Sequence, residues 1–178
     1  METSKSLISP EYLELQQGLH EREDYGTSSV HMAPIVSAII NKMGVTEVLD
    51  YGAGKCTLAP ALRVDHHIKV YPYDPAIEKL SKTPNPREMV VCTDVLEHIE
   101  PDLLENVLDD LKRVTLKIGY FSIATGPAIK LLPDGSNAHL IQEGSDFWLP
   151  KIMERFDIQN FIDTGTNLNI TVYSNVDK

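Results

Sequence analysis

The sequence predicts an α/β protein, a three-layer sandwich whose mainly parallel sheet lies between helices and includes an antiparallel last strand. Three observations predict this fold class. Short apolar runs alternate with amphipathic stretches between residues 34 and 174, as in parallel sheets that helices cover on both faces. A glycine turn at residues 52–54 directly follows the first apolar run. A tight turn at residues 165–167 joins the last two strands, which must therefore pair antiparallel.

The elements of the N-terminal half are predicted from apolar periodicity and from proline and glycine positions. Residues 9–25 are polar and charged, and the residues expected to pack there are Tyr12, Leu13 and Leu15. A helix is expected to begin near Pro34 and to end at Gly44. Its expected buried residues are Ile35, Ile39, Ile40 and Met43. The other elements expected in this half are strands at 46–50, 68–74 and 90–93 and a helix at 56–63.

The C-terminal half begins with a strongly amphipathic helix that opens at Pro101. Its apolar stripe consists of Leu103, Leu104, Val107, Leu108, Leu111 and Val114. A strand at 120–125 precedes a 20-residue stretch, 126–145, with a turn at Asp134-Gly135. Irregular stretches of this length in a compact domain are usually functional lids or disordered. The last expected elements are a helix near 145–156, capped by Ser145 or Asp146, and strands at 158–163 and 168–174.

Composition and charge limit the class of protein. The 178 residues, 42% of them hydrophobic, suffice for a sizeable core, so we expect one domain over residues 1–178. We expect a cytoplasmic chain, because no stretch has the length of a membrane span and residues 1–10 lack the apolar core of a signal peptide. Cys56 and Cys92 are then expected to be buried free thiols. The formal net charge of −10 disfavours duplex nucleic acid as a partner.

The turn after the first strand is the most informative motif of the chain. The strand ends in Asp50, and Gly52 and Gly54 follow at a spacing of two. Glycine adopts positive φ and lets a ligand approach the backbone, so this junction is typical of a nucleotide-type cofactor site. A dinucleotide fingerprint would need a third glycine where Thr57 stands, and Asp50 would repel a pyrophosphate. A cofactor with a cationic group suits the acidic turn better.

The segment Asp50-Tyr51-Gly52-Ala53-Gly54 resembles the first motif of the class I S-adenosylmethionine-dependent methyltransferases, D/E-x-G-x-G-x-G. The resemblance covers about residues 25–174. It implies a Rossmann-like fold, S-adenosyl-L-methionine as the cofactor, and in-line methyl transfer to oxygen or nitrogen of a small-molecule or nucleotide-like acceptor. It also implies that the residues of this segment contact the cofactor.

The sequence departs from the family pattern at two places. Cys56 stands where the motif has its last glycine. Only 19 residues separate Asp74 from Asp94, too few for the usual helix, strand and helix. The region around the family's third strand must therefore be shortened, and its third motif cannot be located.

Asp74 ends the second predicted strand, 20 residues after Gly54. A carboxylate at that position can accept hydrogen bonds from both hydroxyls of a ribose. We therefore interpret Asp74 as a ribose ligand of the cofactor. The alternative is an ordinary turn aspartate before Pro75.

The segment that follows the next strand, residues 93–98, resembles the fourth motif of the family, often D-x-L-E-H in enzymes that act on small molecules. The resemblance places Thr93, Asp94 and Val95 in the cofactor pocket. It places Glu97 and His98 on the substrate side as catalytic candidates. A neutral imidazole at His98 can remove the proton from the attacking oxygen or nitrogen.

The same segment allows a metal-assisted alternative. Small-RNA 2′-O-methyltransferases hold a divalent metal with E-x-x-E-H and a distant histidine, and the ubiquinone O-methyltransferases are similar. Asp94, Glu97, His98 and the loop residue His139 match this pattern with Asp in place of the first Glu. Such a site would take Mg²⁺ or Mn²⁺ and would lower the pKa of a hydroxyl nucleophile. Without a metal, His139 is expected to face the pocket as a further catalytic candidate.

Other interpretations stay open at this stage. Trp148 is either a pocket wall or a core anchor. No role is assigned to His20, His31, His66 and His67. A non-catalytic protein that binds S-adenosylmethionine or a partner is the alternative from another functional class. The sequence gives neither the acceptor nor the oligomeric state.

Overall fold

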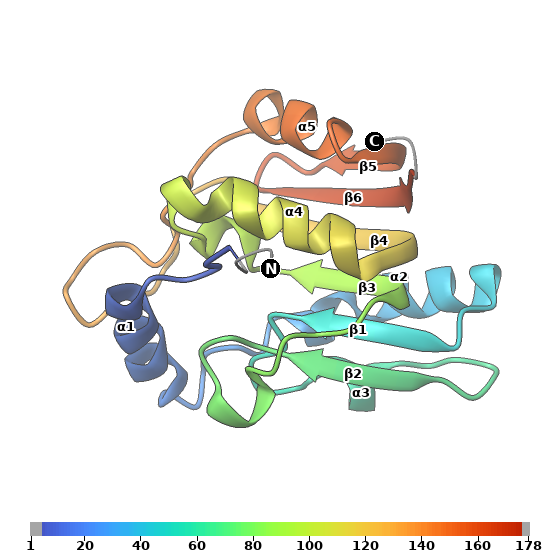
Figure 1. Cartoon of the computed structure of the whole chain (residues 1–178), viewed down its shortest axis with the longest axis horizontal. Helices are drawn as coiled ribbons and strands as arrows, with labels where there is room; N and C mark the ends of the chain where they lie inside the picture. The colour runs from blue at the N-terminus through green and yellow to red at the C-terminus, as the bar shows by residue number, and fades with distance from the viewer. Residues whose placement is uncertain (1–4, 176–178) are drawn as a thin grey trace.

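The computed structural model describes residues 5–175, and its six strands form one sheet in the order β2-β1-β3-β4-β6-β5 (Figure 1). The strands are β1 (Glu47–Tyr51), β2 (Lys69–Tyr73), β3 (Arg87–Thr93), β4 (Thr115–Ala124), β5 (Phe156–Asp163) and β6 (Asn167–Ser174). The pairs β2-β1, β1-β3 and β3-β4 are parallel, whereas β6 pairs antiparallel with both β4 and β5. The prediction of a mainly parallel sheet with an antiparallel last strand is confirmed.

Helices cover both faces of the sheet and its carboxyl edge. They are α1 (Pro10–His20), α2 (Ser29–Met43), α3 (Leu58–Ala61), α4 (Leu104–Val114) and α5 (Ser145–Met153). Helices α4 and α5 pack on one face, and α2 and α3 pack on the other. Helix α1 stands beyond the tips of the strand arrows, at the edge where open α/β folds bind ligands (Figure 1).

The predicted shortening after the second strand is also confirmed. Strand β2 is the edge of the sheet, and no strand pairs with its outer side among the described residues. The connection from β2 to β3 contains one 3-10 turn, Glu78–Leu80. The edge of the sheet where the sequence predicts a cofactor site is therefore formed by the ends of β1, β2 and β3.

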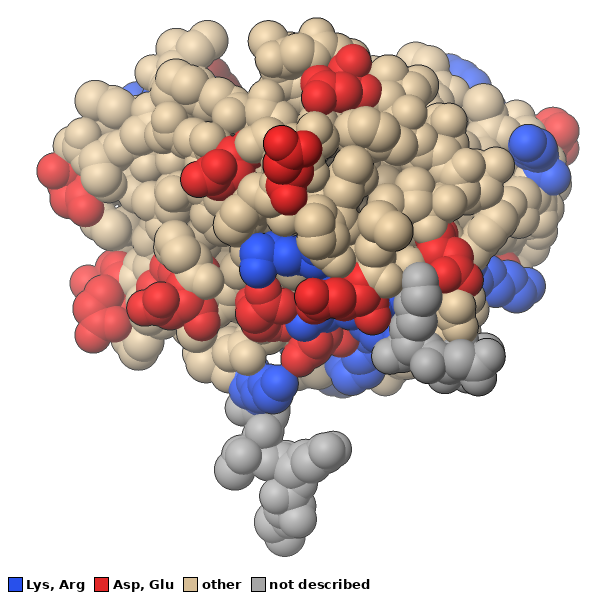
Figure 2. All heavy atoms as spheres, turned by 90° about the horizontal axis from the view of Figure 1, so that it is seen from above, with Lys and Arg blue, Asp and Glu red and all other residues tan. Residues whose placement is uncertain are grey.

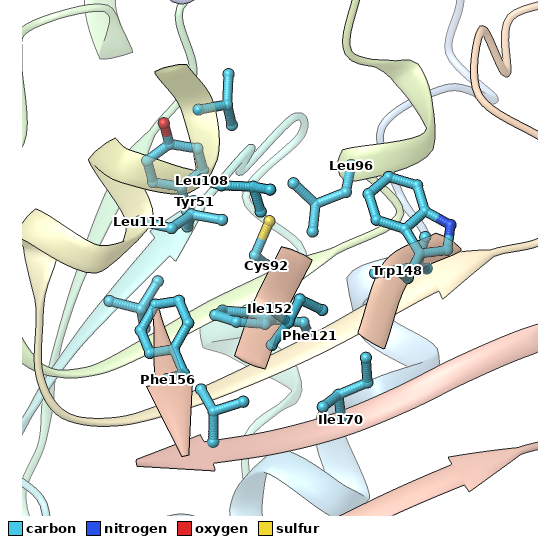
Figure 3. Packing of buried hydrophobic residues seen from close by; sticks show 14 of the residues in the cluster. Tyr51, Cys92, Leu96, Leu108, Leu111, Phe121, Trp148, Ile152, Phe156 and Ile170 are labelled. Atoms are coloured by element: carbon cyan, nitrogen blue, oxygen red, sulfur yellow. The ribbon is translucent and has the colours of Figure 1, made fainter. Parts of the chain in front are cut away.

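The larger core lies between the sheet and the α4–α5 layer. The apolar stripe predicted for α4 is buried from Leu104 to Val114. Leu103 lies in the 3-10 turn Pro101–Leu103 before α4 and is only half-buried. Trp148 of α5 is fully buried and belongs to the same cluster as Phe121 and Ile170 (Figure 3). Trp148 is therefore a core anchor and does not line a pocket, which settles the alternative left open by the sequence.

Helix α2 differs from its expected start and its expected buried face. It begins at Ser29, five residues before Pro34, so this proline lies inside the helix, where its missing N–H removes one intrahelical hydrogen bond. Ile35 and Met43 are 46% and 38% exposed. The buried residues are Ser29, Ala33, Val36, Ser37 and Ile40. Apolar residues occur on both sides of this helix, so periodicity alone did not select the buried one. Gly44 ends it with φ +63°, as predicted.

The remaining differences concern helix ends and one cysteine. Helix α5 begins at Ser145 with Gly144 as its N-cap, so neither Ser145 nor Asp146 caps it. Helix α3 has only one turn. Both cysteines are free, and Cys92 is buried whereas Cys56 is only partly so. No helix within residues 5–175 is long and apolar enough to cross a membrane.

Candidate functional site

The glycine turn after β1 has a shape that side chains would block. Gly52 has φ +80°, and a Cβ there would lie 2.3 Å from Cγ2 of Val95. Gly54 has φ +49°, and a Cβ there would lie 2.6 Å from the carbonyl oxygen of Gly26. Both positions therefore require glycine for the backbone conformation and for the close approach of neighbouring atoms.

The backbone N–H groups of this turn all find acceptors within the chain. Gly52 and Ala53 donate to the carbonyl oxygen of Tyr73 at 2.8 and 2.9 Å. Gly54 donates to Oδ2 of Asp74 at 3.0 Å. The next two residues donate to backbone carbonyls at 2.8 and 2.7 Å. A phosphate-binding turn points free N–H groups at its ligand, and this turn has none to offer.

Asp50 and Tyr51 lie behind the turn, which differs from the expectation that both contact the cofactor. Asp50 is 2% exposed, and burial, followed by the charge of Asp74, raises its pKa to about 7. Tyr51 packs in the core and donates its hydroxyl to Asp110 at 2.9 Å (Figure 3). Side chains along a strand point to the two faces of the sheet, so residues beyond the strand end reach the ligand edge instead.

Asp74 lies at that edge as predicted. It is 5% exposed and lines the cleft. Its Oδ2 accepts from Gly54, and its Oδ1 accepts from the N–H of Ala76 at 3.0 Å. Each carboxylate oxygen can accept two hydrogen bonds, so each one keeps an acceptor position for a ligand hydroxyl.

Asp94 has an unusual backbone conformation at the end of β3. Its φ of +59° is in the left-handed region, which non-glycine residues rarely adopt. Its N–H donates to the carbonyl of Ser122 at 2.9 Å, and its Oδ2 accepts from the hydroxyl of Ser28 at 2.5 Å. Thr93 and Val95 line the cleft beside it. Strained backbone that neighbouring groups hold in place is common at functional sites.

Glu97 does not face the substrate side, which differs from the expectation. It is fully buried, and its Oε1 accepts from the N–H of Ala124 at 2.6 Å. Burial, followed by the charge of Asp94, raises its pKa well above the ordinary value. This raised pKa favours the protonated form of the acid, and its Oε2 is buried with no hydrogen-bond partner.

The long loop folds back over the sheet edge and brings His139 to His98, as the shared-site hypothesis required. Their rings meet edge to face with centroids 4.7 Å apart. Nδ1 of His139 lies 2.7 Å from the carbonyl oxygen of Gly126 and must donate to it, so Nε2 keeps its lone pair in the neutral ring. Nδ1 of His98 is buried with no partner. Burial lowers the pKa of His98 to about 4, despite the opposing charge of Asp94.

Three ligand-type groups converge at this point. One atom each from Asp94, His98 and His139 lie within 4.8 Å of one another. Glu97, the fourth member of the pattern read from the sequence, is not part of this group. Two imidazoles and one carboxylate form a donor set that transition metals accept.

Helix α1 contributes the part of the site that sequence reasoning missed. Its residues at every fourth position face the cleft, together with the preceding Ile8 and the following Tyr25. They are Tyr12, Gln16 and His20. Tyr25 donates to Oε1 of Gln16 at 3.1 Å, Gln16 donates to the hydroxyl of Tyr12 at 2.6 Å, and Tyr12 donates to the carbonyl of His98 at 2.6 Å. The spacing of four in a polar segment was the available signal.

These elements line one cleft, partly open to solvent, at the carboxyl edge of the sheet. The predicted residues that line it are Gly52, Ala53, Gly54, Asp74, Thr93, Asp94, Val95 and His98. The charged residues of the lining are the carboxylates Asp74 and Asp94, and the described lining includes neither lysine nor arginine. The cleft therefore favours neutral or cationic ligands over phosphates.

Comparison with known proteins agrees with this geometry. No family model matches the chain, and no curated protein matches its sequence. Among solved structures, 1,6-didemethyltoxoflavin-N1-methyltransferase of Burkholderia thailandensis, with bound 1,6-didemethyltoxoflavin and S-adenosylhomocysteine, is 16% identical. Its TM-score is 0.59 over 97% of this chain and 93% of that one. DhpI in complex with SAH is 14% identical, with a TM-score of 0.62 over 95% and 100% of the two chains. The 16S rRNA methylase ArmA is 15% identical, with a TM-score of 0.56 over 93% and 97%.

The chain therefore has the fold of the class I S-adenosylmethionine-dependent methyltransferases, as the sequence resemblance implied. The names of these similar structures range from a 1,6-didemethyltoxoflavin methyltransferase to an rRNA methylase. The fold alone does not name an acceptor.

Proposed function

We propose that this protein is an S-adenosylmethionine-dependent methyltransferase that acts on oxygen or nitrogen of a small-molecule or nucleotide-like acceptor. The observation that carries the proposal is the chemistry of the glycine turn. Its N–H groups are all used internally, two carboxylates line the cleft, and no cation lines its described part. A cradle of this kind suits the sulfonium and ammonium groups of S-adenosylmethionine and disfavours the pyrophosphate of NAD or the triphosphate of ATP.

The cofactor, when bound, supplies a methyl group on a positively charged sulfur. The glycine turn, Asp74 and Asp94 would hold it at the carboxyl edge of the sheet, with Asp74 on the ribose side. Such catalysis depends chiefly on placing the acceptor in line with the methyl group. The chain supplies a base for the acceptor proton on the His98 side, where the imidazole of His98 lines the cleft; His139 packs against that ring but is not among the described lining residues.

The charge of the molecule bears on the acceptor class. The net charge is −10, and on the face shown in Figure 2 acidic side chains gather, with basic ones beside them but no continuous basic surface. An extended phosphate backbone needs such a basic surface. A neutral or cationic small molecule fits the cleft better than duplex nucleic acid does.

Metal-assisted O-methylation is the second candidate, and the convergence of Asp94, His98 and His139 favours it. Their ligand atoms lie within 4.8 Å of one another, whereas ligands about 2.1 Å from one ion are about 3.0–3.4 Å apart. Small side-chain movements would close that difference. The donor set suits Mn²⁺ or Zn²⁺ better than Mg²⁺, which prefers oxygen ligands. An ion held there would orient an acceptor hydroxyl and lower its pKa.

Calorimetry with S-adenosylhomocysteine tests the cofactor. We expect wild-type protein to bind it and not NAD or ATP, and we expect Asp74→Ala to weaken binding by about 1–3 kcal/mol because ligand hydroxyls lose their acceptor. Asp102→Ala, an exposed carboxylate in another region, is the matched control. Failure of the wild-type protein to bind would refute the proposal.

Transfer of labelled methyl groups from S-adenosylmethionine to a metabolite pool tests catalysis. Binding without any labelled product would favour the non-catalytic alternative. Metal analysis of the purified protein, before and after incubation with Mn²⁺, Zn²⁺ or Mg²⁺, tests the second candidate. Retention of one ion in Glu97→Gln and its loss in His139→Ala would support the three-ligand site. Equal metal content in His139→Ala and wild type would exclude it.

A further inference from the structure

His20 has the surroundings of a binding residue, although the sequence assigned it no role. It is the last residue of α1 and reaches the cleft beside Asp74. Only 13% of its side chain is exposed, and its ring packs edge to face on Tyr25 with centroids 5.0 Å apart. Nδ1 is buried and has no hydrogen-bond partner. A histidine that serves only to fill space would normally have its ring nitrogens paired.

The gap between His20 and Asp74 has the size of one hydroxyl group. Nε2 of His20 lies 3.9 Å from Oδ2 of Asp74, too far for a direct hydrogen bond. An oxygen atom placed about 2.8 Å from both would bridge them. Burial lowers the pKa of His20, which leaves a ring that can donate from one nitrogen and accept at the other. The pair can therefore hold a hydroxyl that both donates and accepts.

The position of His20 is fixed from two sides. The ammonium group of Lys55, the residue after the glycine turn, donates to the carbonyl oxygen of His20 at 2.6 Å. At the other end of α1, the hydroxyl of Tyr12 donates to the carbonyl of His98. Helix α1 thus spans the cleft from the glycine turn to the His98 side. Its last residue is held over the place where the sequence puts the ribose.

We propose that His20 and Asp74 together form a clamp for a vicinal diol, with His20 contacting a ribose hydroxyl of the cofactor from the roof of the cleft. The identity of the diol as the ribose of S-adenosylmethionine rests on the proposed function. The placement of a hydroxyl between the two side chains rests on the distances alone. Helix α1 is then part of the cofactor site and does not merely cover it.

The test is a comparison of two ligands on three proteins by calorimetry. The ligands are S-adenosylhomocysteine and its 2′,3′-dideoxy analogue, and the proteins are wild type, His20→Ala and the surface control His67→Ala. We expect His20→Ala to weaken binding of S-adenosylhomocysteine about 3- to 10-fold, the loss of one hydrogen bond to the ribose. The same substitution should leave binding of the dideoxy analogue unchanged within about twofold, because that ligand lacks the hydroxyl. His67→Ala should bind both ligands as wild type does.

The outcomes separate this inference from the proposed function. If wild type fails to bind S-adenosylhomocysteine, the cofactor assignment fails and the ribose clamp fails with it. If wild type binds and His20→Ala binds equally well, the clamp is refuted and the cofactor assignment stands. Equal weakening of both ligands would show that His20 acts only on the fold of α1. In His20→Gln, the amide nitrogen can lie near the position of Nε2. This variant should bind S-adenosylhomocysteine more tightly than His20→Ala does, and both variants should bind the dideoxy analogue equally.

Discussion

The buried carboxyl of Asp50 makes a specific prediction about pH and stability. Its pKa is about 7 in the folded protein, because burial and the charge of Asp74 both oppose ionisation. The unfolded value is about 3.9. Between about pH 4 and pH 7 the folded protein keeps a proton on Asp50 that the unfolded chain releases. The contribution of Asp50 to the unfolding free energy is therefore largest below about pH 4 and is lost as the pH rises through 7. This shift in the pKa corresponds to a loss of about 4 kcal/mol in unfolding free energy at pH 8.

Replacing Asp50 with asparagine removes the ionisation and keeps the shape. We expect Asp50→Asn and wild type to have similar unfolding free energies near pH 4. The variant should become progressively more stable than wild type from pH 5 to pH 8, by up to about 4 kcal/mol.

Urea unfolding followed by the fluorescence of Trp148, the one tryptophan of the chain, measures this difference. Asp102→Asn, an exposed carboxylate, is the control and should run parallel to wild type at every pH. A constant difference between Asp50→Asn and wild type from pH 5 to pH 8 would refute the reasoning. It would mean that Asp50 is ionised in the folded protein over that range.

Three further tests concern the turn, the core and the buried acid. Gly54→Ala should lower the unfolding free energy by about 2 kcal/mol or more and weaken cofactor binding, because the new Cβ would clash with the backbone of Gly26. Gly44 also has a positive φ but has open space around it, so Gly44→Ala should lower the unfolding free energy by only about 1 kcal/mol. Trp148→Ala should cost about 3–5 kcal/mol in urea unfolding, and a cost below 1 kcal/mol would contradict its place in the core. Glu97→Ala should lower the unfolding free energy by about 1–3 kcal/mol because the N–H of Ala124 loses its acceptor. Glu97→Gln should lower it far less, because the amide oxygen can still accept from that N–H.

The sequence predicted the parts of the site that depend on local chemistry. Gly52 and Gly54 are required by the conformation of the turn itself, and a sequence can show such a requirement directly. Asp74 follows the end of a strand, and parallel strands bring their carboxyl ends to one edge of the sheet. The shortening of the region around the family's third strand could be predicted from chain length alone, because too few residues lie between Asp74 and Asp94.

The sequence was less informative where two faces of an element compete. Helix α2 carries apolar residues on both sides, and only packing against the sheet decides that Val36 and Ile40 are buried while Ile35 is exposed. In β1, the pattern placed Asp50 and Tyr51 at the cofactor turn. The structure turns their side chains toward the interior, because residues still inside a strand must point to one face or the other.

Only the tertiary structure brought distant segments to the site. His139 reaches His98 because a long loop folds back over the sheet, and Glu97 turns away because the N–H of Ala124 is its partner. Helix α1 is polar on the face that it turns to the cleft, so hydrophobic periodicity gave no sign that His20 would meet Asp74. Local turns follow from the covalent limits of each residue, whereas contacts between remote segments depend on the packing of the whole chain.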